Sequence, residues 1–128
     1  MFETKRFIVI PYSYQRKSAI CFIDKKTKRT YLALKYENKP ESIALSRACL
    51  INDIDGGVSL DNLCYYTENG NEYITALINA FDLEAYLSSD EFQNSTPKYP
   101  EKKKELKKLA ASLKETDNPV LVLVRLKE

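Results

Sequence analysis

The stretch VLVLVRL, Val120 to Leu126, constrains the fold more than any other part of this chain. It is a nearly continuous apolar run rich in valine and leucine, which is typical of a β-strand buried on both faces. Two helical patterns separate it from every earlier strand pattern. This strand must therefore pair with one formed much earlier in the chain, and we expect a β-rich core that the last residues close.

The earlier strand patterns are rich in β-branched and aromatic residues, as half-buried strands are. They are RFIVIPYSY (6–14), SAICFID (18–24), TYLALKYE (30–37), LCYYT (63–67) and YITALI (73–78). Pro11 predicts an edge strand or a bulge, because proline cannot donate to the ladder. DKKTKRTY and the pair Asn69-Gly70 each predict a hairpin, the second because both residues tolerate positive φ. The interrupted apolar segment 43–51 predicts one further strand.

Two segments show helical periodicity. AFDLEAYLSSDEF (80–92) predicts a helix with an apolar stripe of Phe81, Leu83, Ala85, Tyr86 and Leu87. The segment 101–115 predicts a second helix, which Pro100 begins and whose apolar face holds Leu106, Leu109, Ala110 and Leu113. The predicted fold class is therefore mainly β with two helices and about seven antiparallel strands. One domain spans 1–128, with a β meander at 1–79, two helices at 80–115 and a closing strand at 118–127.

The composition excludes several kinds of site. Histidine, the commonest general base and metal ligand, is absent. Cys21, Cys49 and Cys64 are too few for a structural zinc site and too sparse for a disulfide framework, so we expect all three to be small buried apolar residues. The three glycines, at 56, 57 and 70, form no phosphate-binding loop. We therefore expect neither a metal nor a cofactor.

The turn INDIDGG, Ile51 to Gly57, is the one candidate for chemistry. An EF-hand register with Gly56 at position 6 places Ile51 and Asn62 at positions 1 and 12, where neither supplies the required ligand. Asp53 and Asp55 are two residues apart and could act as an acid pair, but acids on one turn are more often solvated. The favoured interpretation is a tight turn at Asp55-Gly56, in which Asn52 or Asp53 caps backbone amides.

Neither nucleic acid nor a membrane is an expected partner. The net charge of +2 is small, and Tyr12 and Tyr14 in KRFIVIPYSYQRK are explained by a half-buried sheet. No segment approaches the roughly 18 apolar residues that a membrane-spanning helix needs. The N-terminal segment lacks the apolar run of a signal peptide, so as written the chain is expected in the cytoplasm.

Three stretches together resemble a known family. INDIDGG, AFDLEAYL and LKETDNPVLVLVRLK are similar, in this order, to the C-terminal portion of the lipoprotein-like six-bladed β-propeller proteins abundant in Bacteroides. The residues that match are Asn52, Asp53, Asp55, Gly56 and Gly57 in the turn, and Asp117, Asn118 and Pro119 in the closing motif. Members of the family are several times longer and carry a secretion signal, and an aromatic stretch stands where this chain has VSLDNLCYY.

The resemblance implies propeller-blade-like sheets, about two blades, and no catalytic residues. If the chain is a fragment of such a protein, it would be periplasmic or at the cell surface. A blade cut from its ring exposes apolar faces and edges, so we expect self-association, as a homodimer or by exchange of VLVLVRL. The predicted function is a non-catalytic binding or interaction module for a protein or an extracytoplasmic ligand. The alternative is a hydrolase or calcium-binding fragment that uses Asp53 and Asp55.

Overall fold

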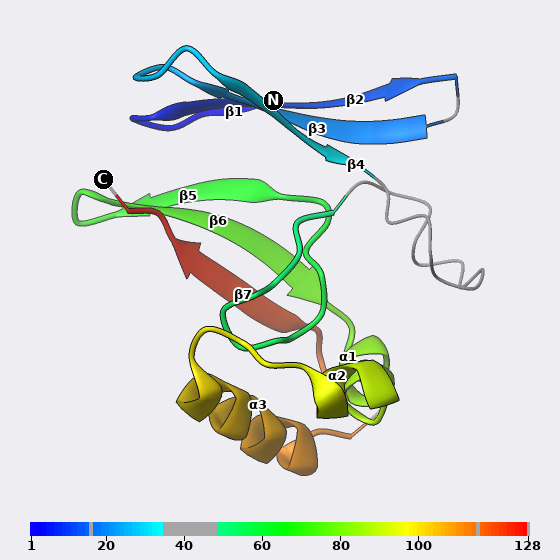
Figure 1. Ribbon diagram of the computed structural model, residues 1–128. Coiled ribbons are helices and arrows are strands. Elements are labelled where there is room, and N and C mark those ends of the chain that lie inside the picture. The colour runs from blue at the N-terminus through cyan, green and yellow to red at the C-terminus, as the bar shows by residue number, and fades with distance from the viewer. Residues whose placement is uncertain (16, 35–48, 115, 128) are drawn as a thin grey trace. The chain divides into compact units, whose positions relative to one another are not determined.

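The computed structural model describes residues 1–15, 17–34, 49–114 and 116–127 (Figure 1). Its strands and helices, in chain order, are β1 (Phe2–Glu3), β2 (Phe7–Tyr14), β3 (Lys17–Asp24), β4 (Thr30–Leu34), β5 (Cys64–Glu68), β6 (Asn71–Ile78), α1 (Ala80–Leu87), α2 (Asp90–Asn94), α3 (Pro100–Ser112) and β7 (Val120–Arg125). The prediction of a mainly β fold with few helices is confirmed. The strand predicted at 43–51 lies mostly outside the described residues.

The strands form two antiparallel sheets, one with the order β1-β2-β3-β4 and one with the order β5-β6-β7. The chain divides into two compact units. The first comprises residues 1–50, 61–76 and 123–128, and the second comprises 51–60 and 77–122. Because β6 and β7 contribute residues to both units, this division does not follow the predicted segments. The prediction of one domain stays a prediction.

The four-stranded sheet of the first unit is a meander of short connections. β2 and β3 pair along their whole length, from Phe7 opposite Asp24 to Tyr14 opposite Lys17. β3 and β4 follow with the predicted turn between them. β1 pairs only with Ile8 and Val9, so it ends before Pro11. Proline therefore stands where the edge of β2 is no longer paired with β1, in agreement with its missing donor.

One face of this sheet carries the core of the first unit. Val9 and Ile20 are 1% and 5% exposed. The partly buried residues packed against this pair are Phe2, Phe7, Phe22, Ala33 and Leu63. Phe2 stacks on Tyr65 of β5 with ring centroids 5.7 Å apart, so aromatic contacts join β1 to β5. We call this side of β1–β4 the core face.

The hairpin of β5 and β6 confirms the prediction made from Asn69 and Gly70. Their φ angles are 49° and 77°, as a two-residue turn of type I′ requires. β7 stands at the edge of the same sheet, and its residues alternate between half-buried and exposed. Leu121 and Leu123 are 56% and 52% exposed. The prediction of a strand buried on both faces was therefore wrong, because only one of the two faces of β7 is covered.

The first predicted helix is divided in two in the second unit. α1 ends at Leu87, and the hydroxyl of Ser89 accepts a hydrogen bond from the Phe92 N–H to cap α2. Leu83 and Leu87 of α1 are buried as predicted, but Phe81 and Ala85 are exposed. The predicted stripe thus included two exposed residues, because the buried positions of α1 are Ala80, Leu83 and Leu87.

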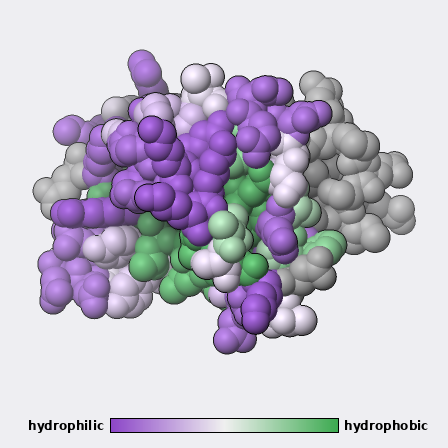
Figure 2. Space-filling model, turned by 90° about the horizontal axis from the view of Figure 1, so that it is seen from below, coloured by the Kyte–Doolittle hydropathy of each residue, from purple (hydrophilic) through white to green (hydrophobic). Residues whose placement is uncertain are grey.

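α3 begins at Pro100 as predicted, and Glu101 lies in its first turn. Leu106, Ala110 and Leu113 are half-buried, whereas Leu109 is 41% exposed and is not part of the covered face. In Figure 2, which views the chain from below, hydrophilic residues make up much of the visible surface. Among the described residues, no helix combines the length and the apolar character needed to cross a membrane.

The cysteines differ from one another in burial. Cys49 is buried as predicted, Cys21 is half-buried and Cys64 is exposed. The prediction was wrong for Cys64, which begins β5 as an exposed residue. All three are free thiols.

Candidate functional site

The turn INDIDGG is held by its own side chains. The Asn52 carbonyl oxygen Oδ1 accepts from the Ile54 N–H at 3.2 Å, and Asp55 Oδ1 accepts from the Gly57 N–H at 2.8 Å. Both are the local bonds by which Asn and Asp stabilise turns. Gly56 has a φ of 75°, a left-handed angle that favours glycine. The predicted tight turn with a capping Asn52 is confirmed.

Asp53 has a different role from the predicted amide cap. Its carboxylate pairs with Lys98 at 3.1 Å, and both side chains are largely exposed, so the pair contributes little to stability. Backbone bonds hold the two segments more firmly. The Lys98 N–H donates to the Asp53 carbonyl at 2.8 Å, and the Tyr99 N–H donates to the Ile54 carbonyl at 3.1 Å. The turn is therefore a docking point for the segment that leads into α3.

The glycine of this turn also lies close to α2. A Cβ placed on Gly56 would lie 2.7 Å from Ser95 Oγ, and Tyr86 Oη donates to the Gly56 carbonyl at 3.2 Å. We expect Gly56→Ala to lower the free energy of unfolding by about 1–3 kcal/mol, measured by urea denaturation. Gly70→Ala is the matched control, since its φ is 77° but no described atom lies within 4 Å of its Cβ. An equal loss of unfolding free energy in both variants would mean that the positive φ alone, and not the contact with Ser95, causes the effect.

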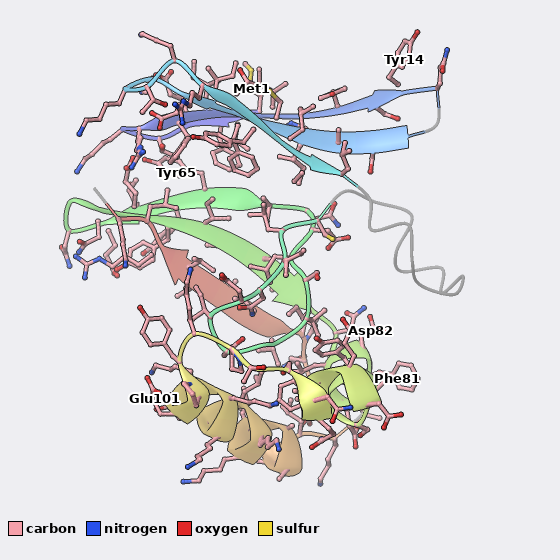
Figure 3. All side chains as sticks on the ribbon, in the orientation of Figure 1. Met1, Tyr14, Tyr65, Phe81, Asp82 and Glu101 are labelled. Atoms are coloured by element: carbon pink, nitrogen blue, oxygen red, sulfur yellow. The ribbon has the colours of Figure 1, made fainter. Side chains whose placement is uncertain are left out.

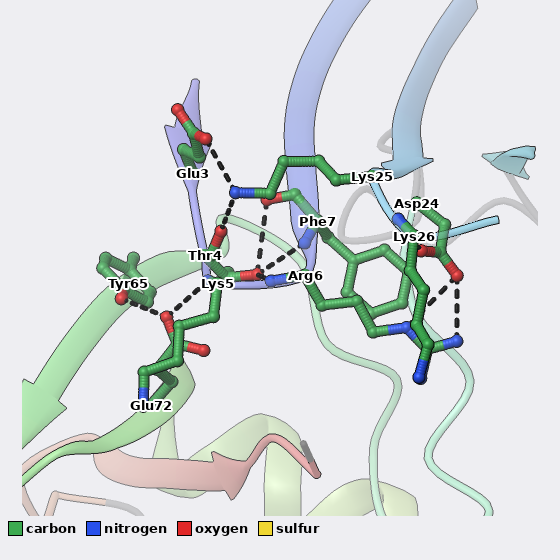
Figure 4. Close-up of polar contacts among 10 residues, drawn as sticks. All are labelled: Glu3, Thr4, Lys5, Arg6, Phe7, Asp24, Lys25, Lys26, Tyr65 and Glu72. Carbon is green, nitrogen blue, oxygen red and sulfur yellow. Dashed lines mark hydrogen bonds and ion pairs between the residues drawn. The ribbon is translucent and has the colours of Figure 1, made fainter. Parts of the chain in front are cut away.

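The first unit holds a buried carboxylate that the sequence reasoning did not single out (Figure 4). Asp24 is 0% exposed and accepts from Arg6 through Nε at 3.1 Å and Nη2 at 2.9 Å. Its other oxygen accepts from the Lys26 and Thr27 amides at 2.9 and 3.2 Å. The hydrogen bond with Arg6 holds the pKa of Asp24 well below its usual range, against the opposing effect of burial.

A second polar group in Figure 4 joins β6 to the loop after β1. Glu72 Oε1 accepts from the Tyr65 hydroxyl at 2.6 Å and from the Lys5 N–H at 2.7 Å. The hydrogen bond to Glu72 raises the pKa of Tyr65. Lys5 Nζ also donates to the Gly70 carbonyl at 2.9 Å. These partners tie β1 and the hairpin together, so both carboxylates, Asp24 and Glu72, are explained by structural bonds.

The closing motif is also a local turn. Asp117 Oδ2 accepts from the Lys114 N–H at 2.8 Å, and the Asp117 N–H donates to the Lys114 carbonyl at 2.9 Å. Asn118 and Pro119 follow as exposed residues and lead directly into β7. Within the described ranges, no three His, Cys, Asp or Glu side chains are grouped so that they could hold a metal ion.

The most unusual surface of the first unit is the sheet face opposite its core. Residues paired across antiparallel strands share a face, so the register gives three rows across β2, β3 and β4. The rows are Ile8–Ile23–Thr30, Ile10–Cys21–Leu32 and Tyr12–Ala19–Leu34. We call these nine residues the Leu32 face. None of them is charged.

Much of the Leu32 face is open to solvent. Leu32 is 55%, Leu34 61% and Tyr12 43% exposed. Tyr14, 68% exposed, continues the face beyond the rows, and in Figure 3 it projects from the tip of the β2–β3 hairpin, away from Tyr65. The sheet is thus half-buried as predicted, and Tyr12 and Tyr14 lie on its open face. Contiguous apolar surface of this kind is typical of interaction sites.

Comparisons with known proteins add no relative. No family model, curated protein or solved structure matches this chain. The assignment of a function therefore depends on the residues themselves. A sequence signal for the Leu32 face did exist, because both alternating sets of TYLAL and of FIVIPYSY are apolar or aromatic apart from Thr30 and Ser13. A sheet with only one buried face would have shown polar residues in one of the two sets.

Proposed function

We propose that this chain is a non-catalytic interaction module that binds a second copy of itself through β4 and the Leu32 face. The observation that carries the proposal is the exposure of Leu32 and Leu34 on a strand that stands at the edge of its sheet. Natural edge strands are usually protected by charged residues, proline or bulges. Within its described residues, TYLAL, β4 has none of these protections.

A second copy fits this edge better than an unrelated strand does. Two β4 strands related by a twofold axis at Leu32 pair antiparallel, so that Leu32 faces its own copy and Tyr31 faces Ala33. Such self-pairing brings identical residues together, and any charge on β4 would meet a like charge. β4 carries no charge, so this cost is absent. The Leu32 faces of the two sheets then form one continuous surface.

A non-catalytic role is supported by the partners of the two turn carboxylates. Asp55 is bonded to Gly57 and Asp53 is paired with Lys98, so one oxygen of each carboxylate already serves the turn. The relationship to β-propeller proteins also stays a proposal. It is supported by the four-stranded antiparallel sheet β1–β4, which has the size of one propeller blade.

Light scattering coupled to size exclusion tests the proposal at tens of micromolar chain. We expect the wild-type chain to have the mass of a dimer. Leu32→Lys places two ammonium groups against each other at the twofold axis, and we expect the dimer dissociation constant to rise on the order of 100-fold. A wild-type chain that is monomeric at this concentration would contradict the proposal.

Leu121→Lys is the matched control for Leu32→Lys. Leu121 is 56% exposed on β7, which is the edge of the other sheet and the strand that the sequence suggested for exchange. We expect Leu121→Lys to leave the mass unchanged. If Leu121→Lys dissociates the dimer and Leu32→Lys does not, association occurs through β7 and the assignment to β4 is wrong.

A further inference from the structure

A pocket of about 630 Å³ lies in the first unit at the end of the core face. Its apolar floor includes Val9 and Ile20, the two most central residues of that core. Pro11 and Ser13 line it from β2, past the point where β1 stops pairing, and Leu63 lines it from the segment that enters β5. The pocket thus lies beside the buried core pair, past the point where β1 stops pairing with β2.

The pocket is lined by uncharged residues only. Polar atoms come from neutral groups only, among them the hydroxyls of Ser13 and Ser18, the Asn62 amide and the Cys64 thiol. Sites for small molecules typically have volumes of about 300–1,000 Å³, a mostly apolar lining and a few neutral or charged polar groups that set orientation. This pocket has that composition without the charge.

The walls are also fixed by contacts outside the pocket. Phe2, which lines one end, is stacked on Tyr65 and belongs to a strand paired with β2. Asn62 has a φ of 45°, so the chain turns sharply there before β5 begins. Val9 is 1% exposed, which leaves it no freedom to fill the space. A pocket whose walls are held in this way loses little entropy when a ligand binds.

We propose that this pocket binds an uncharged, largely apolar small molecule that carries a hydroxyl or carbonyl group. The apolar body lies on Val9 and Ile20, and the polar group is hydrogen-bonded at the rim by neutral side chains such as Ser13. An ionised ligand is disfavoured, because its charge would lose its hydration on binding and would find no opposite charge in the pocket. No residue of β4 lines this pocket, but Tyr12 and Ala19 of the Leu32 face do, so the site borders the surface proposed for self-association.

The first test uses Nile red as a neutral fluorescent probe and two competitors of similar shape. We expect saturable Nile red binding to the wild-type chain with a Kd on the order of 10 µM. 2-Naphthol, which is neutral, should displace the dye, and 2-naphthoate, which is anionic, should need a concentration about tenfold higher or more. Equal displacement by the two competitors would overturn the assignment of an uncharged ligand.

Two tryptophan variants locate the bound probe. Ser13 is exposed on the rim, so Ser13→Trp fills the pocket without touching its floor, and we expect the Kd for Nile red to rise about tenfold or more. Thr67→Trp is the control, because Thr67 is an exposed β5 residue of the same unit outside the lining. If Thr67→Trp weakens Nile red binding as strongly as Ser13→Trp does, the assignment of the site is wrong. It is also wrong if neither variant weakens binding.

Cys64 supplies a readout that needs no change in the pocket. It lines the pocket and is exposed, whereas Cys49 is buried, so a Cys21→Ser chain has one accessible thiol. We expect 2-naphthol at about ten times its Kd to slow alkylation of Cys64 by iodoacetamide about tenfold. An unchanged rate would contradict the proposal even if Ser13→Trp failed to fold. Displacement of the dye by dimer formation, seen on raising the chain concentration, would identify a second chain as the occupant instead.

Discussion

Replacing Asp24 by alanine is expected to destabilise the β1–β4 sheet more than any other single change in the first unit. The substitution removes the acceptor of four hydrogen bonds, two from Arg6 and one each from the Lys26 and Thr27 amides. Asp24 is 0% exposed, so water cannot replace its carboxylate without entering the structure. We expect the Tm to fall by on the order of 10 °C, measured by far-UV circular dichroism.

The same carboxylate gives the wild-type chain a defined dependence on pH. Its pKa is lower in the folded chain than the ordinary value of about 3.9 that applies on unfolding. The stability that Asp24 contributes is therefore complete above about pH 5 and is lost as the pH falls through 3.9 toward the lower folded pKa. We expect the Tm of the wild type and that of Asp24→Ala to approach each other between about pH 4 and pH 2.

Asp24→Asn separates the charge from the shape. The amide oxygen can still accept from Lys26 and Thr27, but the amide nitrogen is a donor and cannot accept from Arg6. We expect a Tm between those of the wild type and Asp24→Ala, with no approach to the Asp24→Ala value at low pH. If Asp24→Asn had the same Tm as the wild type, the Arg6 hydrogen bonds would contribute nothing to stability. The explanation of the low pKa of Asp24 would then be wrong.

Local features of the fold could be predicted from the sequence because their causes are local. Asn69-Gly70 allows positive φ at two successive residues, and the structure has it at both. Pro100 begins α3 because a first-turn residue needs no N–H partner. The division between α1 and α2 has a local cause too. Ser89 is followed by two acidic residues, which is a typical signal for a helix N-cap. The prediction of one continuous apolar stripe across this segment did not take that signal into account.

What could not be predicted was which side of each element is covered. VLVLVRL is apolar at almost every position, yet β7 exposes Leu121 and Leu123 because only one face of the strand is covered. The outcome depends on what packs against each face, and a run that is apolar on both faces does not encode it. The same reason explains Cys64. The partnership of Arg6 with Asp24 also depends on register, since it follows from the pairing of Phe7 with Asp24.

The second unit is expected to depend on one aromatic residue in its shortest helix. Phe92 of α2 is 0% exposed, and its ring centroid lies 5.9 Å from that of Tyr86. Lys103 Nζ lies 4.8 Å from the same centroid and also donates to the Gln93 and Ser95 carbonyls at 3.1 and 2.7 Å. Burial is the main cause that lowers the pKa of Lys103. α2 and α3 therefore meet at Phe92.

Phe92→Ala should lower the free energy of unfolding of this unit by about 3–5 kcal/mol, the range for removal of a buried phenylalanine ring. Urea denaturation followed at 222 nm measures the loss of helix. Phe81→Ala is the matched control, because Phe81 is 58% exposed on α1 and its removal should cost less than about 1 kcal/mol. Equal losses would mean that α2 is not the packing centre of the unit.

Phe92→Leu then divides the loss between volume and ring. Leucine keeps most of the apolar contact but removes the π face beneath Lys103, and beneath Lys107 at 5.7 Å. If the cation contacts stabilise the unit, Phe92→Leu should lower its free energy of unfolding by about 1–2 kcal/mol. Adding Lys103→Met should restore part of this loss, because it removes a charge that no longer lies over an aromatic ring. A Lys103→Met change with the same effect in both backgrounds would show that Lys103 and the ring are not energetically coupled.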